Sequence, residues 1–361
     1  MEIIPVNTVY WLIDIVFRKL GVPKADAKIC ADVLIASDLR GIESHGIGRL
    51  KMYYDRIKEE IQFPVTKIDI IKDNLATAVW DGNHGMGQVI AHKAMETAIE
   101  KARVYGMGSV AVRNSNHYGI AGYYSKMAAD NDMIGMSFTN ARPAIAPTFG
   151  VEPMFGTNPI TFAAPTDLDF HFLYDGATSI CQRGKIEVLD REDKITPDSW
   201  VIDEKGNPLT DSKDILSKLI TRKASLLPLG GSDELSGAHK GYGFATIVEI
   251  LSSALQGGSF LHTLGGMKNG RSAHLNLGHF FMAINIDSFI EIKEFKRITG
   301  EIIRQLQNSE KKPGKERIYV AGEKEFLKEK EIRKSGIPIN PVLRDDLLTI
   351  IEELQIPGIQ L

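Results

Sequence analysis

Hydrophobic residues recur at helical spacing in three segments near the start of the chain. The first two segments, at 8–21 and 24–41, each end in a glycine, a residue that commonly follows a helix. The third segment, at 49–60, has the same spacing, and Ser44 is placed to cap the start of this helix. The first sixty residues are therefore predicted to be helical.

From about residue 66 the pattern changes, and short β-rich runs alternate with helical patterns. The strand-like runs lie at 67–73, 76–82, 108–114 and 136–140. The helical patterns between them lie at 87–106 and 120–135. This succession predicts an α/β core with strands that are buried on both faces.

The second half of the chain returns from strands to helices. The segment 141–159 holds four prolines and two glycines, which excludes a long helix there. Further strand-like runs lie at 160–165, 170–180 and 278–287, and the chain is again mostly helical from Ile290. We therefore expect a helical domain built from both termini, residues 1–65 with 290–361, and an α/β domain at 66–289.

Composition removes several classes of function. The chain carries 43 Lys and Arg residues against 46 Asp and Glu residues, a net charge of −3, so it lacks the basic footprint of a nucleic-acid binder. Two cysteines are too few for a disulfide framework, and no metal-binding spacing occurs. No apolar run approaches the ~20 residues of a membrane span, and the start of the chain lacks a signal-peptide cleavage site. We expect a cytoplasmic protein that binds no nucleic acid, membrane or metal.

Glycine-rich stretches are present, but none is the dinucleotide fingerprint. The sequences at 85–90, 106–111 and 241–246 each lack the third glycine, and no phosphate-binding P-loop occurs. A standard Rossmann fold is therefore disfavoured. The loop before the helix at about 240 offers glycine amides and Lys240 to an anion, although a flexible connector explains it equally well.

The stretch "GIESHGIGRL" at 41–50 holds the most suggestive chemistry. If residues 44–56 are helical, His45 and Arg49 share one face. Arg49 could grip a carboxylate with two parallel hydrogen bonds, and His45 could exchange a proton with a neighbouring group. Ser44 could orient the imidazole or cap the helix. A 2-hydroxy or 2-oxo acid has the matching layout, although a lone histidine more often has a structural role.

Six motifs occur together and in order: "SHGIGRL", "RNSNHYGIAGYY", "FGTNPI", "DGATS", "LPLGG" and "HKGYG". With them the chain resembles the type-2 malate/L-lactate dehydrogenase family over nearly its whole length. The resemblance implies a non-Rossmann, L-sulfolactate dehydrogenase-like α/β fold, with a mixed-sheet cofactor domain. It also implies NAD or NADP as cofactor and a homodimer whose active site lies close to the subunit interface.

The resemblance also assigns roles to individual residues. His45 is expected to be the acid/base with Ser44 beside it, Arg49 to bind the substrate carboxylate, and Thr157 to contact the substrate. In some members the histidine that matches His117 takes the proton instead. The positions that match cofactor contacts are His117, Tyr118, Gly119, Ile120, Ala121, Asn140, Asp175, Gly176, Ala177, Lys240, Gly322 and Glu323.

The chain departs from the family in places. Gly176 replaces a methionine, and Ala321 replaces the proline of a Pro-Gly-Glu motif. Lys185 lies where cyclic-imine reductases carry an aspartate, which disfavours imine reduction.

Malate, lactate and sulfolactate remain open as substrates. The alternatives are a ureidoglycolate, diketogulonate or cyclic-imine oxidoreductase, or a catalytically idle dinucleotide-binding protein, which Gly176 favours. NAD and NADP also stay open, because Arg142 or Arg183 could meet a 2′-phosphate or be solvated.

Overall fold

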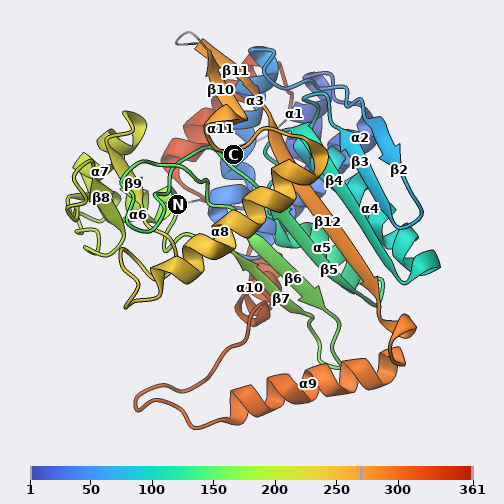
Figure 1. Cartoon of the computed structure of the whole chain (residues 1–361). Coiled ribbons are helices and arrows are strands. Elements are labelled where there is room, and N and C mark those ends of the chain that lie inside the picture. The colour runs from blue at the N-terminus through green and yellow to red at the C-terminus, as the bar shows by residue number, and fades with distance from the viewer. Residues whose placement is uncertain (1, 269–270, 359–361) are drawn as a thin grey trace.

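The computed structural model describes residues 2–268 and 271–358. Its centre is a seven-stranded mixed sheet in the order β2-β3-β4-β12-β5-β6-β7 (Figure 1). The strands are β2 (Asp69–Asp73), β3 (Thr77–Asp81), β4 (Met107–Ser115), β5 (Met133–Thr139), β6 (Ile160–Ala164), β7 (Phe172–Gly176) and β12 (Leu277–Asn285). In this sheet β3 and β4 are parallel and the other neighbours are antiparallel. The predicted non-Rossmann α/β class is confirmed.

The two faces of the sheet differ in burial. Helices α4 (Gly87–Tyr105) and α5 (Gly122–Ala129) cover one face, and α8 (Ala238–Ser253) crosses the other (Figure 1). On the central strand β12, Phe281 is fully buried, whereas Met282 is only partly buried. The prediction that the strands are buried on both faces therefore holds for the α4/α5 face and only in part for the other, where Phe138 is buried but Met282 is not.

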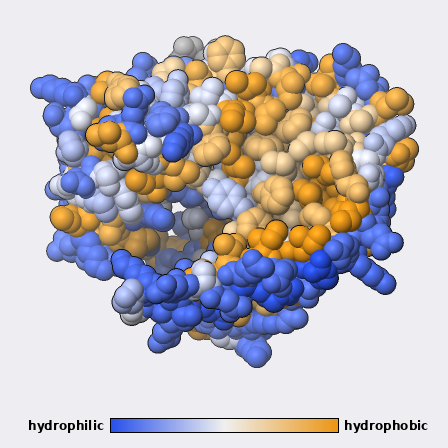
Figure 2. All heavy atoms as spheres, turned by 60° about the horizontal axis from the view of Figure 1, so that its bottom comes forward, coloured by the Kyte–Doolittle hydropathy of each residue, from blue (hydrophilic) through white to orange (hydrophobic). Residues whose placement is uncertain are grey.

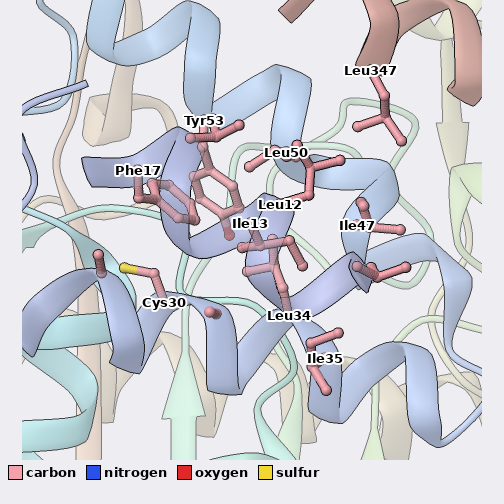
Figure 3. Close-up of a cluster of buried hydrophobic side chains, with 14 of the residues drawn as sticks. Leu12, Ile13, Phe17, Cys30, Leu34, Ile35, Ile47, Leu50, Tyr53 and Leu347 are labelled. Carbon is pink, nitrogen blue, oxygen red and sulfur yellow. The ribbon is translucent and has the colours of Figure 1, made fainter. Parts of the chain in front are cut away.

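The two ends of the chain pack together. Helices α1 (Val6–Lys19), α2 (Lys24–Leu39) and α3 (Leu50–Lys58) share a core in which Phe17, Leu34 and Tyr53 are buried (Figure 3). Leu347 of α11 (Pro341–Glu353) and Ile332 of α10 (Glu323–Ser335) belong to the same core.

Strand β1 (Glu2–Ile4) also pairs antiparallel with β13 (Ile337–Ile339). In contrast, α9 (Ile292–Asn308) lies along the edge of the molecule, away from this core (Figure 1). The division into 1–65 with 290–361 and 66–289 stays a prediction.

A smaller lobe flanks the sheet and has its own hydrophobic cluster. It consists of α6 (Arg183–Arg191), β8 (Val201–Asp203), α7 (Ser212–Ile220) and β9 (Ala224–Leu226). The hairpin β10 (Gly265–Lys268) and β11 (Arg271–Leu275) precedes the central strand. Within the residues described above, no helix is long and apolar enough to cross a bilayer.

Short 3-10 turns complete the structure. They are η1 (Glu43–His45), η2 (Ile47–Arg49), η3 (Ala254–Gln256), η4 (Leu261–Leu264) and η5 (Ile286–Ser288).

Candidate active site

A cavity opens where the end of the α2 segment meets the loop before α5 and the sheet. The space within it has a volume of about 140 Å³. Most of the residues that the sequence singled out line it: His45, the segment 117–121, Asn140, Thr157, Asp175 and Ala177. Residues more than a hundred positions apart in the sequence are thus brought to one place.

Two imidazoles face each other in this cavity. The rings of His45 and His117 are stacked, with centroids 5.4 Å apart and planes 22° apart. The Ser44 hydroxyl lies 2.8 Å from Nδ1 of His45. Burial, and next to it the charge of Arg49, lowers the pKa of His45 to about 4. Burial likewise places the pKa of His117 well below its usual value. Both rings are therefore neutral near pH 7 and able to accept a proton.

The backbone around His45 differs from the predicted continuous helix over 44–56. Two 3-10 turns, η1 and η2, flank Gly46, and α3 begins only at Leu50. Ser44 does not cap α3, whose N-cap residue is Arg49. The break has a physical cause in Asp38: a Cβ at Gly46 would lie 1.8 Å from the Asp38 Oδ1 atom.

Arg49 lies close to His45 despite this break. Its Nε atom donates a hydrogen bond to the Ser44 carbonyl, at 2.5 Å. Its charge contributes to the lowered pKa values of both His45 and His117. Arg49 does not form part of the cavity wall itself. The loop 44–49 therefore puts a hydroxyl, an imidazole and a guanidinium within reach of one another.

Tyr53 is a functional candidate that the sequence reading missed. Its hydroxyl lies 2.6 Å from Nδ1 of His117, and its side chain is fully buried. The Gly119 amide also points at this Nδ1, at 3.4 Å. No local spacing in the sequence signals this contact, because Tyr53 and His117 are 64 positions apart.

His279 is a second residue whose position the sequence did not reveal. Its ring stacks on Tyr118 with centroids 4.5 Å apart, behind the cavity wall. Its two nitrogens lie 2.8 Å from the hydroxyls of Thr139 and Ser115. Burial lowers the pKa of His279 to about 3, so this ring is a neutral support.

In the loop that leads into α5, a glycine allows the backbone to approach α2 closely. Gly119 has a φ of +82°, and a Cβ there would lie 2.5 Å from Val33. Asp175 accepts a hydrogen bond from the Gly122 amide at 2.7 Å, and burial raises the pKa of its carboxyl. The loop backbone is thus fixed against α2 on one side and β7 on the other.

A second hollow continues from the cavity and shares Ile42 and Asp175 with it. Gly322 and Tyr174 line this hollow. Gly176 does not line either space; a Cβ there would lie 2.4 Å from the Tyr174 hydroxyl. Tyr174 thus occupies the room that a larger residue at 176 would need. Together the cavity and this hollow form a groove that runs from His45 and His117 to Gly322.

Besides Gly176, two expected cofactor positions lie outside this groove. Lys240 is exposed in the first turn of α8. Glu323 is buried and bound by Arg317, by the Gln307 amide at 2.9 Å and by the Val320 amide at 3.2 Å. The structure therefore does not place these two side chains at the cavity wall, and their cofactor roles stay predictions.

The chain thus combines a seven-stranded mixed sheet, which lacks the dinucleotide fingerprint, with a groove that ends at two neutral imidazoles. The family model for malate/L-lactate dehydrogenase matches residues 4–348. The chain belongs to this family, and a dehydrogenase of this family uses a nicotinamide cofactor.

Named relatives agree with this assignment. The malate dehydrogenase of Pyrococcus abyssi is 47% identical over 357 residues, which cover 99% of this chain and 96% of the relative. The L-sulfolactate dehydrogenase of Methanocaldococcus jannaschii is 42% identical over 97% of this chain and 96% of its own. The crystal structure of malate dehydrogenase from Entamoeba histolytica matches with a TM-score of 0.96 and 43% identity, over 99% of both chains. The predicted family, fold and oxidoreductase class are thereby confirmed.

Proposed function

We propose that this protein transfers a hydride between NAD(P) and C2 of a small 2-hydroxy/2-oxo acid: malate/oxaloacetate, lactate/pyruvate or sulfolactate/sulfopyruvate. The observation that carries the proposal is the stacked pair His45 and His117, kept neutral by burial beside Arg49 at one end of a groove. The names of the malate and sulfolactate relatives support the choice of substrate class.

His45 is the proposed acid/base. In its neutral form it accepts the hydroxyl proton as the acid is oxidised, and it returns the proton during reduction. For Nε2 to accept that proton, Nδ1 must carry hydrogen and donate to the Ser44 hydroxyl, which lies 2.8 Å away. Arg49 binds the C1 carboxylate, and Thr157 narrows the pocket.

The cofactor supplies the carbon that accepts or donates the hydride. We assign its binding to the segment 117–121, Asn140, Asp175 and Ala177, which line the cavity, and to Gly322 in the adjoining hollow. Asn140 is itself held in place, because its side chain accepts from the Gly278 amide at 2.8 Å and donates to Glu249 at 3.3 Å. Fixing both reactants at attack distance supplies much of the rate acceleration.

His117 is the alternative proton acceptor. It is partly buried, and the Tyr53 hydroxyl lies 2.6 Å from its Nδ1. In our proposal this ring orients the substrate oxygen and stacks on His45, whereas His45 carries the proton.

Cofactor fluorescence tests the proposal directly. Titrating NADH and NADPH into the protein measures binding, and adding oxaloacetate, pyruvate or sulfopyruvate then measures oxidation of the bound cofactor. We expect oxidation by at least one of these acids. Cofactor binding without oxidation by any of them would instead support the idle dinucleotide-binding protein.

We also propose a homodimer. Ile298, Ile302 and Leu306 form an exposed apolar stripe on α9, and Phe244 and Ile247 are exposed on α8. Figure 2 shows hydrophobic residues gathered over a broad area of the face that includes α9. An apolar area of this kind marks a surface that associates with another, and a second copy of the chain is the proposed occupant.

We also propose a cytoplasmic location. Cys30 and Cys181, both buried thiols, support it.

A further inference from the structure

A buried carboxyl group on α8 has no positively charged partner. Glu249 is only 6% exposed and lies in the helix that packs on β5 and β12. Within residues 2–268 and 271–358 it forms no ion pair. A carboxyl group that is taken from water destabilises the protein unless hydrogen bonds compensate for the lost hydration. Its two oxygens therefore depend on nearby N–H donors.

Three N–H groups donate to Glu249. Its Oε1 atom accepts from the Leu261 backbone amide at 2.9 Å and from the side-chain amide of Asn140 at 3.3 Å. Its Oε2 atom accepts from the side-chain amide of Asn158 at 2.8 Å. Both asparagines are fully buried, and one follows β5 whereas the other precedes β6. Glu249 thus connects the end of one strand to the start of the next.

Both asparagines lie in segments that line the cavity. Asn140 is the middle residue of 139–141, and all three of these residues line it. Asn158 lies between Thr157 and Pro159, which also line it. A shift of either segment would change the shape of the cavity.

The carboxyl group also fixes the direction in which each amide points. An ionised carboxylate only accepts hydrogen bonds, so both side chains must turn their NH2 groups toward Glu249. The Asn140 oxygen then faces away and accepts from the Gly278 amide at 2.8 Å. The NH2 group of Asn158 donates to the Ala245 carbonyl as well, at 3.1 Å. Asn158 has a φ of +35°, a sparsely populated conformation that persists only where the surrounding contacts hold it.

We propose that Glu249 is a positioning residue that sets the shape of the cavity, because its carboxyl group holds the segments 139–141 and 157–159 in place through Asn140 and Asn158. Glu249 itself does not line the cavity. The consequence for the cofactor rests on the proposed function, which assigns Asn140 to cofactor binding. Glutamine has the same shape as glutamate but only one oxygen, so its NH2 group would face one of the three donors. At least one of these hydrogen bonds is then lost.

Hydrogen–deuterium exchange of the protein without cofactor tests this role directly. We expect Glu249→Gln to speed amide exchange in 139–141 and 157–159 by about 10-fold or more, the effect of one hydrogen bond to a charged group. Asp81→Asn is the matched control. Asp81 is also a buried carboxyl group that accepts three hydrogen bonds, and it lines neither the cavity nor the adjoining hollow. Exchange in the two segments that is unchanged in Glu249→Gln, or equally faster in both variants, would overturn the inference.

An exchange of the two partners keeps the test decisive if Glu249→Gln does not fold. Asn158→Asp alone sets two carboxyl groups against each other, whereas Asn158→Asp combined with Glu249→Gln restores a donor and an acceptor. We expect the double variant to protect 157–159 better than Asn158→Asp does, or to fold where Asn158→Asp does not. Effects of the two substitutions that only add would refute the direct coupling.

Cofactor binding separates a positioning role from a merely structural one. The dissociation constant is measured by fluorescence with NADH or NADPH, whichever the wild type binds more tightly. We expect it to rise by about 10-fold in Glu249→Gln and to stay unchanged in Asp81→Asn, although both variants lower the thermal midpoint. An unchanged dissociation constant in Glu249→Gln would contradict the positioning role. If the wild type oxidises the cofactor with no 2-oxo acid, the proposed function fails, whereas the exchange rates still decide the role of Glu249.

Discussion

At the scale of single residues, Asp38 shapes the segment that presents His45. Its carboxyl is buried and accepts a hydrogen bond from the Ile47 amide at 2.8 Å. It also fills the space beside Gly46 that any side chain would need. Asp38 never touches the cavity wall, yet it fixes the turn between the two 3-10 segments.

Burial raises the pKa of Asp38 to about 8, which makes a prediction for stability. Between about pH 4 and 8 the native state keeps this proton while the unfolded state has lost it, so the contribution of Asp38 to stability falls as the pH rises through this window. We expect the free energy of unfolding of the wild type, relative to Asp38→Asn, to fall by roughly 2–4 kcal/mol from pH 5 to pH 8. Urea denaturation at both pH values measures it, and parallel pH profiles would contradict the assignment.

The sequence predicted part of the residue-scale picture. His45 and His117 lie 72 positions apart, and their joint importance came from the resemblance, whereas the stacking of their rings needed the structure. Tyr53 and His279 were missed because their partners are remote in sequence. No local spacing announces a hydrogen bond from Tyr53 to a ring 64 positions away.

At the scale of elements, helix α3 contacts both the candidate site and the C-terminal helix α11. Tyr53 lies on the side that faces His117, whereas the neighbouring Tyr54 turns to the C-terminal helix and donates a hydrogen bond to Glu353. The helix thereby connects the candidate site to the packing of the two termini.

This pair of tyrosines offers a matched test. We expect Tyr53→Phe to lower kcat about 5- to 10-fold, because His117 loses an oriented hydrogen bond worth about 1 kcal/mol. Tyr54→Phe should lower the thermal midpoint through the lost contact to Glu353 and leave kcat unchanged. Steady-state rates and thermal melts of both variants measure this. Equal changes of kcat in the two variants would show that Tyr53 acts only through the fold.

The periodicity of the sequence predicted the long helices α1 and α4 well, because each of them buries one apolar side. It failed at 44–49, where the helical pattern continues but a side chain from α2 interrupts the backbone. It also gave no strand order. Strand β12 is inserted between β4 and β5 from more than a hundred residues away, and such long-range pairing leaves no local signature.

At the scale of the whole molecule, the exposed hydrophobic face makes a prediction about assembly. Ile302 lies in the middle of the α9 stripe and is 56% exposed. Two ion pairs hold α9 on the body of the protein: Lys296 with Asp132 at 2.6 Å, and Arg304 with Asp167 at 3.0 Å. The stripe is thereby presented as a rigid surface.

We expect Ile302→Asp to convert a dimer into a monomer, because a charge would be buried in an apolar interface. Lys293→Asp, nine residues earlier on the opposite side of α9, is the control and should leave the dimer intact. Sedimentation velocity at micromolar concentration distinguishes the two states. A wild type that sediments as a monomer would contradict the proposed assembly.

The central claim is that His45 moves the proton while the groove beyond it holds the cofactor. The most direct measurement is kcat of His45→Ala with the acid that the wild type turns over best, alongside the dissociation constant for the cofactor. We expect kcat to fall by about 10²- to 10⁴-fold, with the cofactor still bound. Turnover close to that of the wild type would contradict the claim and assign the proton to His117.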